Sequence, residues 1–302
     1  MAGSESAGRL GKPFGWAGWL TAVPEDWRPL RIQGTHERGV VDLGDATRPR
    51  GQLAWSVVTR KRFDALRTLR RTMQRSARGV PIVVVPGADL EPLLLAEDEK
   101  TGRIRFAGFA SQTRRVVQGF VEGEKGQETV PELRAILTGL SDQAKDKPHK
   151  WSFFSIRFTV PPDFRYREAA LTLGDMRVSL VTGSEKPAAE LHLRHVYPSE
   201  LALARDDLGA WAAREWLRTS GERRAKTPAT TKVKTELGPA AMCCKQRRAR
   251  PWLPIGHRPL MEQRCLAIHD ETHQRLVIVH AVVEESRMSG IIHKVLGGMY
   301  WK

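Results

Sequence analysis

The sequence predicts an α+β protein made of two tandem repeats, each an antiparallel sheet with one main packed helix, a hairpin and a short closing helix. Two observations support this fold class. The motif V-P-E-D-W-R at residues 23–28 recurs as V-P-P-D-F-R at residues 160–165. Elements of the same kinds then follow both copies in the same order, which indicates an internal duplication.

Each repeat begins with an aromatic-rich strand that ends at a proline turn. Trp16 and Trp19 precede the first motif, and Trp151, Phe153 and Phe158 precede the second. Short alternating segments separated by glycine and polar turns follow in both halves, and this pattern is typical of a strand meander.

Apolar residues at helical spacing predict one main helix in each repeat. In the first repeat the helix covers residues 62–75, where Leu66, Leu69 and Met73 share one face. In the second repeat the helix begins at Ser199, a residue type that often caps helices, and it continues to residue 218.

A strand hairpin and a short helix complete each predicted repeat. Residues 93–109 read as strand, turn and strand, and residues 264–283 are their expected counterpart. The closing helices are expected at residues 130–140 and 288–296.

The predicted domain boundaries follow from these elements. Residues 219–250 are rich in Lys, Arg, Thr and Pro and lack an apolar period, so we expect a basic, flexible insertion there. The expected order is a disordered N-terminus (1–15), a first α+β repeat (16–140), a linker (141–150) and a second α+β repeat (151–302) that contains the insertion.

Each repeat resembles the PsbP-like family of α+β proteins. The resemblance rests on residues 23–28 and 160–165, where an early strand ends in a proline turn with an aromatic, and on the order of the elements. That family consists largely of accessory and binding proteins, so the resemblance implies a non-enzymatic role.

A formal net charge of +15 favours contact with nucleic acid, anionic lipid or an acidic protein. The charge is densest at residues 59–78, where a cationic face lies opposite an apolar stripe; the alternative is a solvated outer face of a packed helix. The candidate polyanion-binding residues in this segment are Arg60, Lys61, Arg67, Arg70, Arg71 and Arg75.

A second basic cluster lies in the predicted insertion and contains Lys245, Arg247, Arg248 and Arg250. A flexible basic loop can follow a polyanion without reading its sequence. The alternative is an insertion whose charge serves solubility alone.

Familiar catalytic signatures are missing from the sequence. It contains no G-x-S-x-G motif, no P-loop and no glycine-rich dinucleotide turn, so we assign no catalytic residue and expect no cofactor. The H-D-E-T-H segment at residues 269–273 places Glu midway between the histidines, whereas zinc proteases need Glu directly after the first His. Cys265 and His269 would be about 13 Å apart in a strand, so no metal site is expected.

The aromatic residues of the two repeated motifs, Trp27 and Phe164, have two interpretations. Their main expected role is architectural, with each ring covering an edge of its sheet beside a turn held by Asp. The alternative is a ligand groove lined by both rings.

We therefore expect a non-enzymatic interaction or accessory protein of unknown pathway. The sequence does not identify its partner, although the charge is compatible with a nucleic acid or an acidic protein. The alternatives are a nucleic-acid-binding protein that uses residues 59–78 and 219–250, and an enzyme with an unrecognised site between the repeats. Three cysteines without a disulfide pattern, the absence of a long apolar run and an N-terminus unlike a signal peptide predict a cytoplasmic protein without a transmembrane segment.

Overall fold

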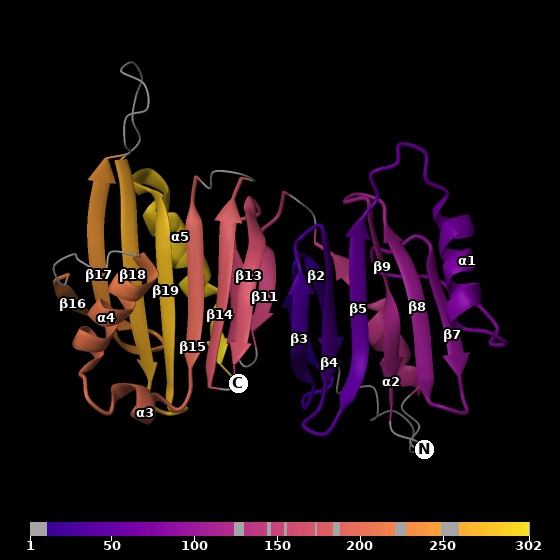
Figure 1. Cartoon of the computed structure of the whole chain (residues 1–302), viewed down its shortest axis with the longest axis horizontal. Helices are drawn as coiled ribbons and strands as arrows, with labels where there is room; N and C mark the ends of the chain where they lie inside the picture. The colour runs from indigo at the N-terminus through magenta and orange to yellow at the C-terminus, as the bar shows by residue number, and fades with distance from the viewer. Residues whose placement is uncertain are drawn as a thin grey trace, which may run out of the picture. The chain divides into compact units, whose positions relative to one another are not determined.

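The computed structural model describes residues 11–123, 130–143, 146–153, 156–172, 174–183, 188–220, 228–248 and 260–301. The chain forms two compact units. Unit 1 comprises Met1–Pro162 and Gly298–Lys302, and unit 2 comprises Asp163–Gly297. Each unit contains one seven-stranded antiparallel sheet (Figure 1).

The large sheet of unit 1 has the strand order β3-β4-β5-β9-β8-β7-β6. Helix α1 (Ala65–Ser76) packs on one face of it, over β7 and β8 (Figure 1). The strands are β3 (Arg28–Gly34), β4 (Arg38–Gly44), β5 (Pro49–Val57), β6 (Val83–Val85), β7 (Leu93–Asp98), β8 (Arg103–Ala110) and β9 (Arg115–Glu122).

The large sheet of unit 2 has the order β13-β14-β15-β19-β18-β17-β16, which repeats that of unit 1 strand for strand. The same sheet topology in both halves confirms the α+β class and the internal duplication. The strands are β13 (Phe164–Thr172), β14 (Asp175–Thr182), β15 (Glu190–Val196), β16 (Thr230–Thr235), β17 (Gly238–Arg248), β18 (Leu260–Asp270) and β19 (Arg275–Glu284).

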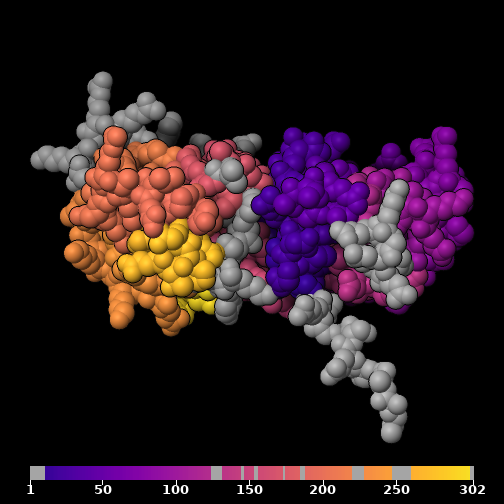
Figure 2. Space-filling model, turned by 90° about the horizontal axis from the view of Figure 1, so that it is seen from below, coloured from indigo at the N-terminus to yellow at the C-terminus, as the bar shows by residue number. Residues whose placement is uncertain are grey.

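Two helices cover opposite faces of the unit 2 sheet. Helix α4 (Leu208–Ser220) packs Trp211 and Trp216 against Ala241, Cys243, Cys265 and Ala267. Leu296 of α5 (Glu285–Gly297) packs instead on the alternate residues of the same strands, among them Ala240 and Leu266. Helix α5 (yellow) forms part of the outer surface of this unit (Figure 2).

Two small three-stranded sheets complete unit 1. One contains β1 (Lys12–Trp16), β2 (Trp19–Val23) and β10 (Ser141–Asp142), and the other contains β11 (His149–Phe153), β12 (Ile156–Val160) and β20 (Tyr300–Trp301). The two sheets pack through an edge-to-face contact between Trp16 and Trp151, whose ring centroids are 5.3 Å apart. Residues 12–15, expected to be disordered, thus belong to β1, and the expected linker at residues 141–150 holds β10 and the start of β11.

The expected equivalence of the hairpins at residues 93–109 and 264–283 is wrong by one strand. By position in the sheets, β18 and β19 are equivalent to β8 and β9, and not to β7 and β8. The error arose because β7, β8 and β9 are all short apolar strands of similar pattern, so one pair of them resembles another.

The flexible insertion predicted at residues 219–250 is also wrong where the structure describes it. Thr230–Thr235 and Gly238–Arg248 form β16 and β17, which are equivalent to β6 and β7. Strand β16 lies at the sheet edge, with Lys232 and Lys234 exposed, and lysine on an edge strand discourages pairing with other chains. The basic composition of this segment is therefore that of an edge strand and not that of a flexible loop.

The predicted main helices are present with shifted boundaries. In α1, Asp64 is the N-cap and accepts a hydrogen bond from the Arg67 amide at 2.9 Å. The second predicted helix is divided into α3 (Ser199–Leu203) and α4, and Pro198 rather than Ser199 occupies the N-cap position of α3. The closing helix of the first repeat is α2 (Val130–Thr138), and that of the second is α5. None of the helices among the described residues is long and apolar enough to cross a bilayer.

A buried ion pair joins the large sheet of unit 1 to the β1-β2-β10 sheet. Arg115, at the start of β9, donates from Nε to Asp142 of β10 at 2.9 Å, and both side chains are 2% exposed. The same guanidinium donates to the carbonyl of Ala17 at 2.7 Å and lies 4.5 Å above the ring of Trp19. Ala17 and Trp19 belong to the β1–β2 hairpin and Asp142 belongs to β10, so this arginine of β9 fixes the relation of the two sheets within the unit.

Removing this arginine should destabilise unit 1 strongly. We expect Arg115→Ala to lower the free energy of unfolding by about 3–5 kcal/mol, because Asp142 would remain buried without its partner. Urea unfolding followed by tryptophan fluorescence measures the change. Arg31→Ala is the control, because Arg31 is 52% exposed in its pair with Asp42 and should cost less than about 1 kcal/mol. A loss below about 1 kcal/mol for Arg115→Ala would contradict the structural role.

Candidate functional site

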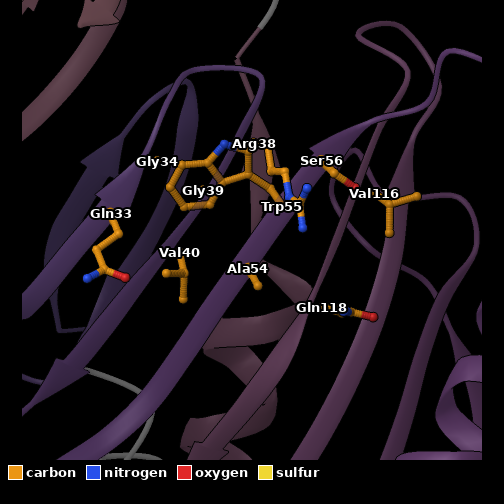
Figure 3. A pocket seen from close by; sticks show the side chains of 10 residues that line it. All are labelled: Gln33, Gly34, Arg38, Gly39, Val40, Ala54, Trp55, Ser56, Val116 and Gln118. Atoms are coloured by element: carbon orange, nitrogen blue, oxygen red, sulfur yellow. The ribbon is translucent and has the colours of Figure 1, made fainter. Parts of the chain in front are cut away.

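The part of the unit 1 sheet that α1 leaves uncovered contains a pocket of about 470 Å³. Residues that are directly paired on neighbouring strands lie on the same face of a sheet and form a cross-strand row. One such row passes from beneath the helix into this pocket. Leu94 and Ala107 in this row pack against α1, whereas Gln118, Ala54, Val40 and Gln33 continue the row along the pocket (Figure 3).

Small side chains create the hollow. Val40 and Ala54 are directly paired at its centre, and no large side chain stands between Gln33 and Gln118. Gly39 allows the Trp55 ring to lie against the backbone of β4, since a Cβ atom there would be only 2.5 Å from the ring. The Trp55 indole N–H donates to the carbonyl of His36 at 3.1 Å, which holds the ring in place.

The pocket is cationic. Arg38 and Ser56 lie directly opposite one another at one end of it, and both are exposed. Within the described part of the chain, the Arg38 guanidinium has no hydrogen-bond or ion-pair partner, and no carboxylate lines the pocket. Asp42 lies further along β4 on the same face, but Arg31 at 2.7 Å and the Gln52 amide at 2.8 Å already occupy it.

The structure places the predicted cationic segment on the outside of α1 and on the residues before it. Leu69 and Met73 point into the core, and the arginines lie on the remaining faces of the helix. None of these cations forms an ion pair with another described residue. The exposed side chains are Arg60, Lys61, Arg67, Arg70, Arg71 and Arg75.

In the equivalent helix of unit 2, arginines form ion pairs with carboxylates. On α4, Arg214 pairs with Asp206, and Arg218 pairs with Glu215 at 2.7 Å. Unit 2 therefore neutralises the arginines of its main helix internally, and unit 1 does not.

The second predicted basic cluster belongs to β17 and the residues after it. Lys245 is exposed on β17, and Arg247 and Arg248 are the last two residues of that strand, while Arg250 lies outside the described residues. The structure thus keeps Lys245 and the cations of α1 in different units.

The two motif aromatics are core residues. Trp27 is 5% exposed inside unit 1, and Phe164 is fully buried inside unit 2. Neither ring offers a surface for a ligand, so the predicted groove lacks support in the described residues.

The histidines of residues 269–273 are bound to neighbours within unit 2. His269 Nε2 lies 3.0 Å from the Ser199 hydroxyl, and His273 Nδ1 lies 2.7 Å from Asp270. Among the described residues, no group of three or more His, Cys, Asp or Glu side chains is placed to hold a metal ion.

A hydrogen-bonded chain on β14 and β15 was not foreseen from the sequence. The Ser179 hydroxyl lies 3.0 Å from His192 Nδ1, and His192 Nε2 lies 3.1 Å from Glu190. These residue types also form nucleophile, base and acid in hydrolases. Ser179 is buried, however, and the three residues come from alternate positions of paired strands, a spacing that carries no sequence motif.

Two buried histidines of unit 2, His195 and His280, lie in no sequence motif. Burial, with repulsion from Arg275, lowers the pKa of His195 to about 4, and neither ring nitrogen has a described hydrogen-bond partner. Burial and the neighbouring His192 lower the pKa of His280 to about 3. Both histidines are therefore neutral at pH 7.

Comparison with known proteins assigns no function. No protein-family model matches the chain, and no curated protein matches it. Among solved structures, the Ran-binding protein Mog1p of Saccharomyces cerevisiae is 10% identical, with a TM-score of 0.34 over 51% of this chain and 95% of its own. A point mutant of protein Mog1 gives the same identity and TM-score over 51% and 96%. A protein of Bacteroides thetaiotaomicron is 10% identical, with a TM-score of 0.29 over 49% and 45%.

The buried histidines make unit 2 sensitive to mild acid. An unfolded histidine binds a proton near pH 6.5, whereas folded His195 does so only near pH 4, so stability falls as the pH drops between these values. We expect His195→Leu to reduce the slope of the free energy of unfolding against pH by up to about 1.4 kcal/mol per pH unit. The variant should also gain about 1 kcal/mol at pH 7, because it removes a polar ring without partners.

Urea unfolding of the wild type and of His195→Leu at pH 7 and pH 5 measures both effects. Thr231→Leu on β16 is the control, because Thr231 is exposed and carries no titratable group, so its replacement should leave the pH slope unchanged. Equal slopes for His195→Leu and the wild type would show that His195 does not cause the acid sensitivity.

Proposed function

We propose that this protein is a non-enzymatic interaction protein that binds an acidic partner protein through the cationic outer face of α1. The observation that supports this proposal is the set of exposed arginines on α1 that have no described carboxylate partner. A surface of this kind attracts negative charge and accelerates the association of an acidic partner.

The placement of these arginines favours a binding role over a purely solubilising one. Arg67, Arg71 and Arg75 follow one another at intervals of four residues, so like charges lie on adjacent turns. Each such pair destabilises a helix by about 0.2–0.5 kcal/mol. The first turn of the helix, where a cation opposes the helix dipole, also carries Arg67 and no acidic residue. An anionic partner would relieve both effects.

Nucleic acid is the second candidate partner, and the same arginines support it because they would also neutralise phosphates. An acidic protein is favoured over a single-stranded nucleic acid because the pocket beside α1 presents no exposed aromatic ring on which a base could stack; Trp55 is 3% exposed. The resemblance of each repeat to the PsbP-like family and a cytoplasmic location remain untested predictions, and an enzyme with an unrecognised site remains an untested alternative.

Neutralising the α1 face should weaken anion binding without changing the fold. We expect replacement of Arg67, Arg70, Arg71 and Arg75 by Gln to weaken binding of a fluorescent ten-residue glutamate peptide and to flatten its salt dependence. Gln and Arg have similar helix propensities, so the circular dichroism spectrum should stay the same. Fluorescence anisotropy across a salt series measures the binding.

The control variant removes the same amount of charge from unit 2. It replaces four exposed cations by Gln: Arg205, Lys232, Lys234 and Lys294. Equal weakening by both variants would mean that net charge alone determines binding. A DNA duplex that binds more tightly than the peptide at physiological salt, and depends on the α1 arginines, would favour the nucleic-acid candidate instead.

A further inference from the structure

The internal duplication allows the pocket of unit 1 to be compared with the same place in unit 2. The turns before β9 and β19 supply the alignment, because Arg114 and Gln274 both have a positive φ, 57° and 54°, and each precedes a buried arginine that begins the strand. Following the strand pairing from these turns, Ala54 is equivalent to Arg194.

The same register relates the rest of the two cross-strand rows. Val40 is equivalent to Arg177, and Arg38, two residues earlier, is equivalent to Asp175. Towards the helices, Ala107 and Leu94 beneath α1 are equivalent to Ala267 and Ala241 beneath α4, which supports the alignment.

In unit 2 this place is filled by an internal arginine–carboxylate network. Arg194 donates to Asp175 of β14 at 2.6 Å and also pairs with Glu215 of α4, so its guanidinium is held between two carboxylates. Arg177 pairs with the same Asp175. Burial alone would raise the pKa of Asp175, but hydrogen bonds from Arg194 and Arg177 outweigh it and lower the pKa.

Unit 1 retains an arginine here and lacks the carboxylates. Arg38 replaces Asp175, Ala54 replaces Arg194, and no carboxylate of α1 or of the sheet lines the pocket. The exposed Gln33 and Gln118 amides and the Ser56 hydroxyl face the same hollow, and none of them has a described partner. The hollow therefore offers several hydrogen-bond donors and one guanidinium to a ligand from outside the chain.

We propose that this pocket of unit 1 binds a carboxylate side chain of an acidic segment of a partner protein, in the place where unit 2 holds its own Glu215 and Asp175. The guanidinium of Arg38 would form the paired hydrogen bonds that arginine makes with a carboxylate, and the Gln and Ser donors would add to them. This inference rests on the proposed binding of an acidic partner, and it assigns the pocket as the place where that partner is recognised. The pocket lies on the same sheet face as α1, so one extended segment can reach both.

A carboxylate placed inside the pocket tests this proposal. Ser56 is directly opposite Arg38, so Ser56→Glu should occupy the guanidinium as Asp175 occupies Arg194. We expect Ser56→Glu to raise the Kd of the fluorescent ten-residue glutamate peptide about tenfold, and the uncharged Ser56→Gln to change it less than twofold. Anisotropy at physiological salt, with the full-length protein, measures both.

Arg38→Gln is an independent variant, and it should also raise the Kd about tenfold. Its control is Lys100→Gln, which removes one exposed charge at the opposite end of the sheet, in the turn between β7 and β8, and should change the Kd less than twofold. Circular dichroism confirms that each variant is folded, and a failure of one variant to fold leaves the other as the test.

The outcomes separate this inference from the proposed function. If Ser56→Glu and Arg38→Gln bind the peptide like the wild type while the α1 variant binds weakly, the pocket proposal is overturned and the acidic-partner function stands. If the wild type does not bind the peptide near physiological salt, both are overturned. If a DNA duplex binds and Ser56→Glu weakens the duplex but not the peptide, the pocket receives phosphate and the carboxylate assignment is overturned.

Discussion

One helix cannot cover a seven-stranded sheet, and the candidate site of this protein follows from that constraint. Strands are spaced about 4.8 Å apart, and a helix with its side chains is about 10 Å wide, so one helix lying along the strands covers roughly two or three of them. In unit 1, α1 packs on β7 and β8, and the remainder of that face depends on the side chains of β3, β4, β5 and β9. The two units differ in what lies on this uncovered part of the sheet. In unit 2, Glu215 of α4 and the Asp175–Arg194 pair fill it, whereas unit 1 leaves a hollow beside Arg38.

This difference connects the fold to a binding role. A packed arginine–carboxylate network satisfies its own charges and presents little to a partner, whereas an arginine without a counterion attracts one. Unit 1 carries such cations both on α1 and in the adjacent pocket. The buried Arg115–Asp142 pair holds the other face of the same sheet against β10, so the open face is presented on a rigid support.

Much of the fold could be predicted from the sequence because the duplication is visible in residues 23–28 and 160–165 and in the order of the apolar segments. Strands β16 and β17 could not be predicted, because they combine lysine with small residues and lack the apolar pattern that marks a buried strand. The cationic residues of α1 could be named in advance because they are consecutive on one helix. The pocket could not, because Arg38, Ala54 and Gln118 come from three strands and meet only through the pairing register.

The central claim is that an acidic segment docks on the open sheet face of unit 1, and the location of binding tests it most directly. Backbone amide NMR spectra of the full-length protein, recorded during titration with an unlabelled ten-residue glutamate peptide, report that location. We expect saturable shifts at Val40, Ala54 and Gln118, with the equivalent residues Arg177, Arg194 and Ile278 of unit 2 unaffected. Shifts confined to unit 2, or distributed evenly over all exposed cations without saturation at the pocket residues, would contradict the account.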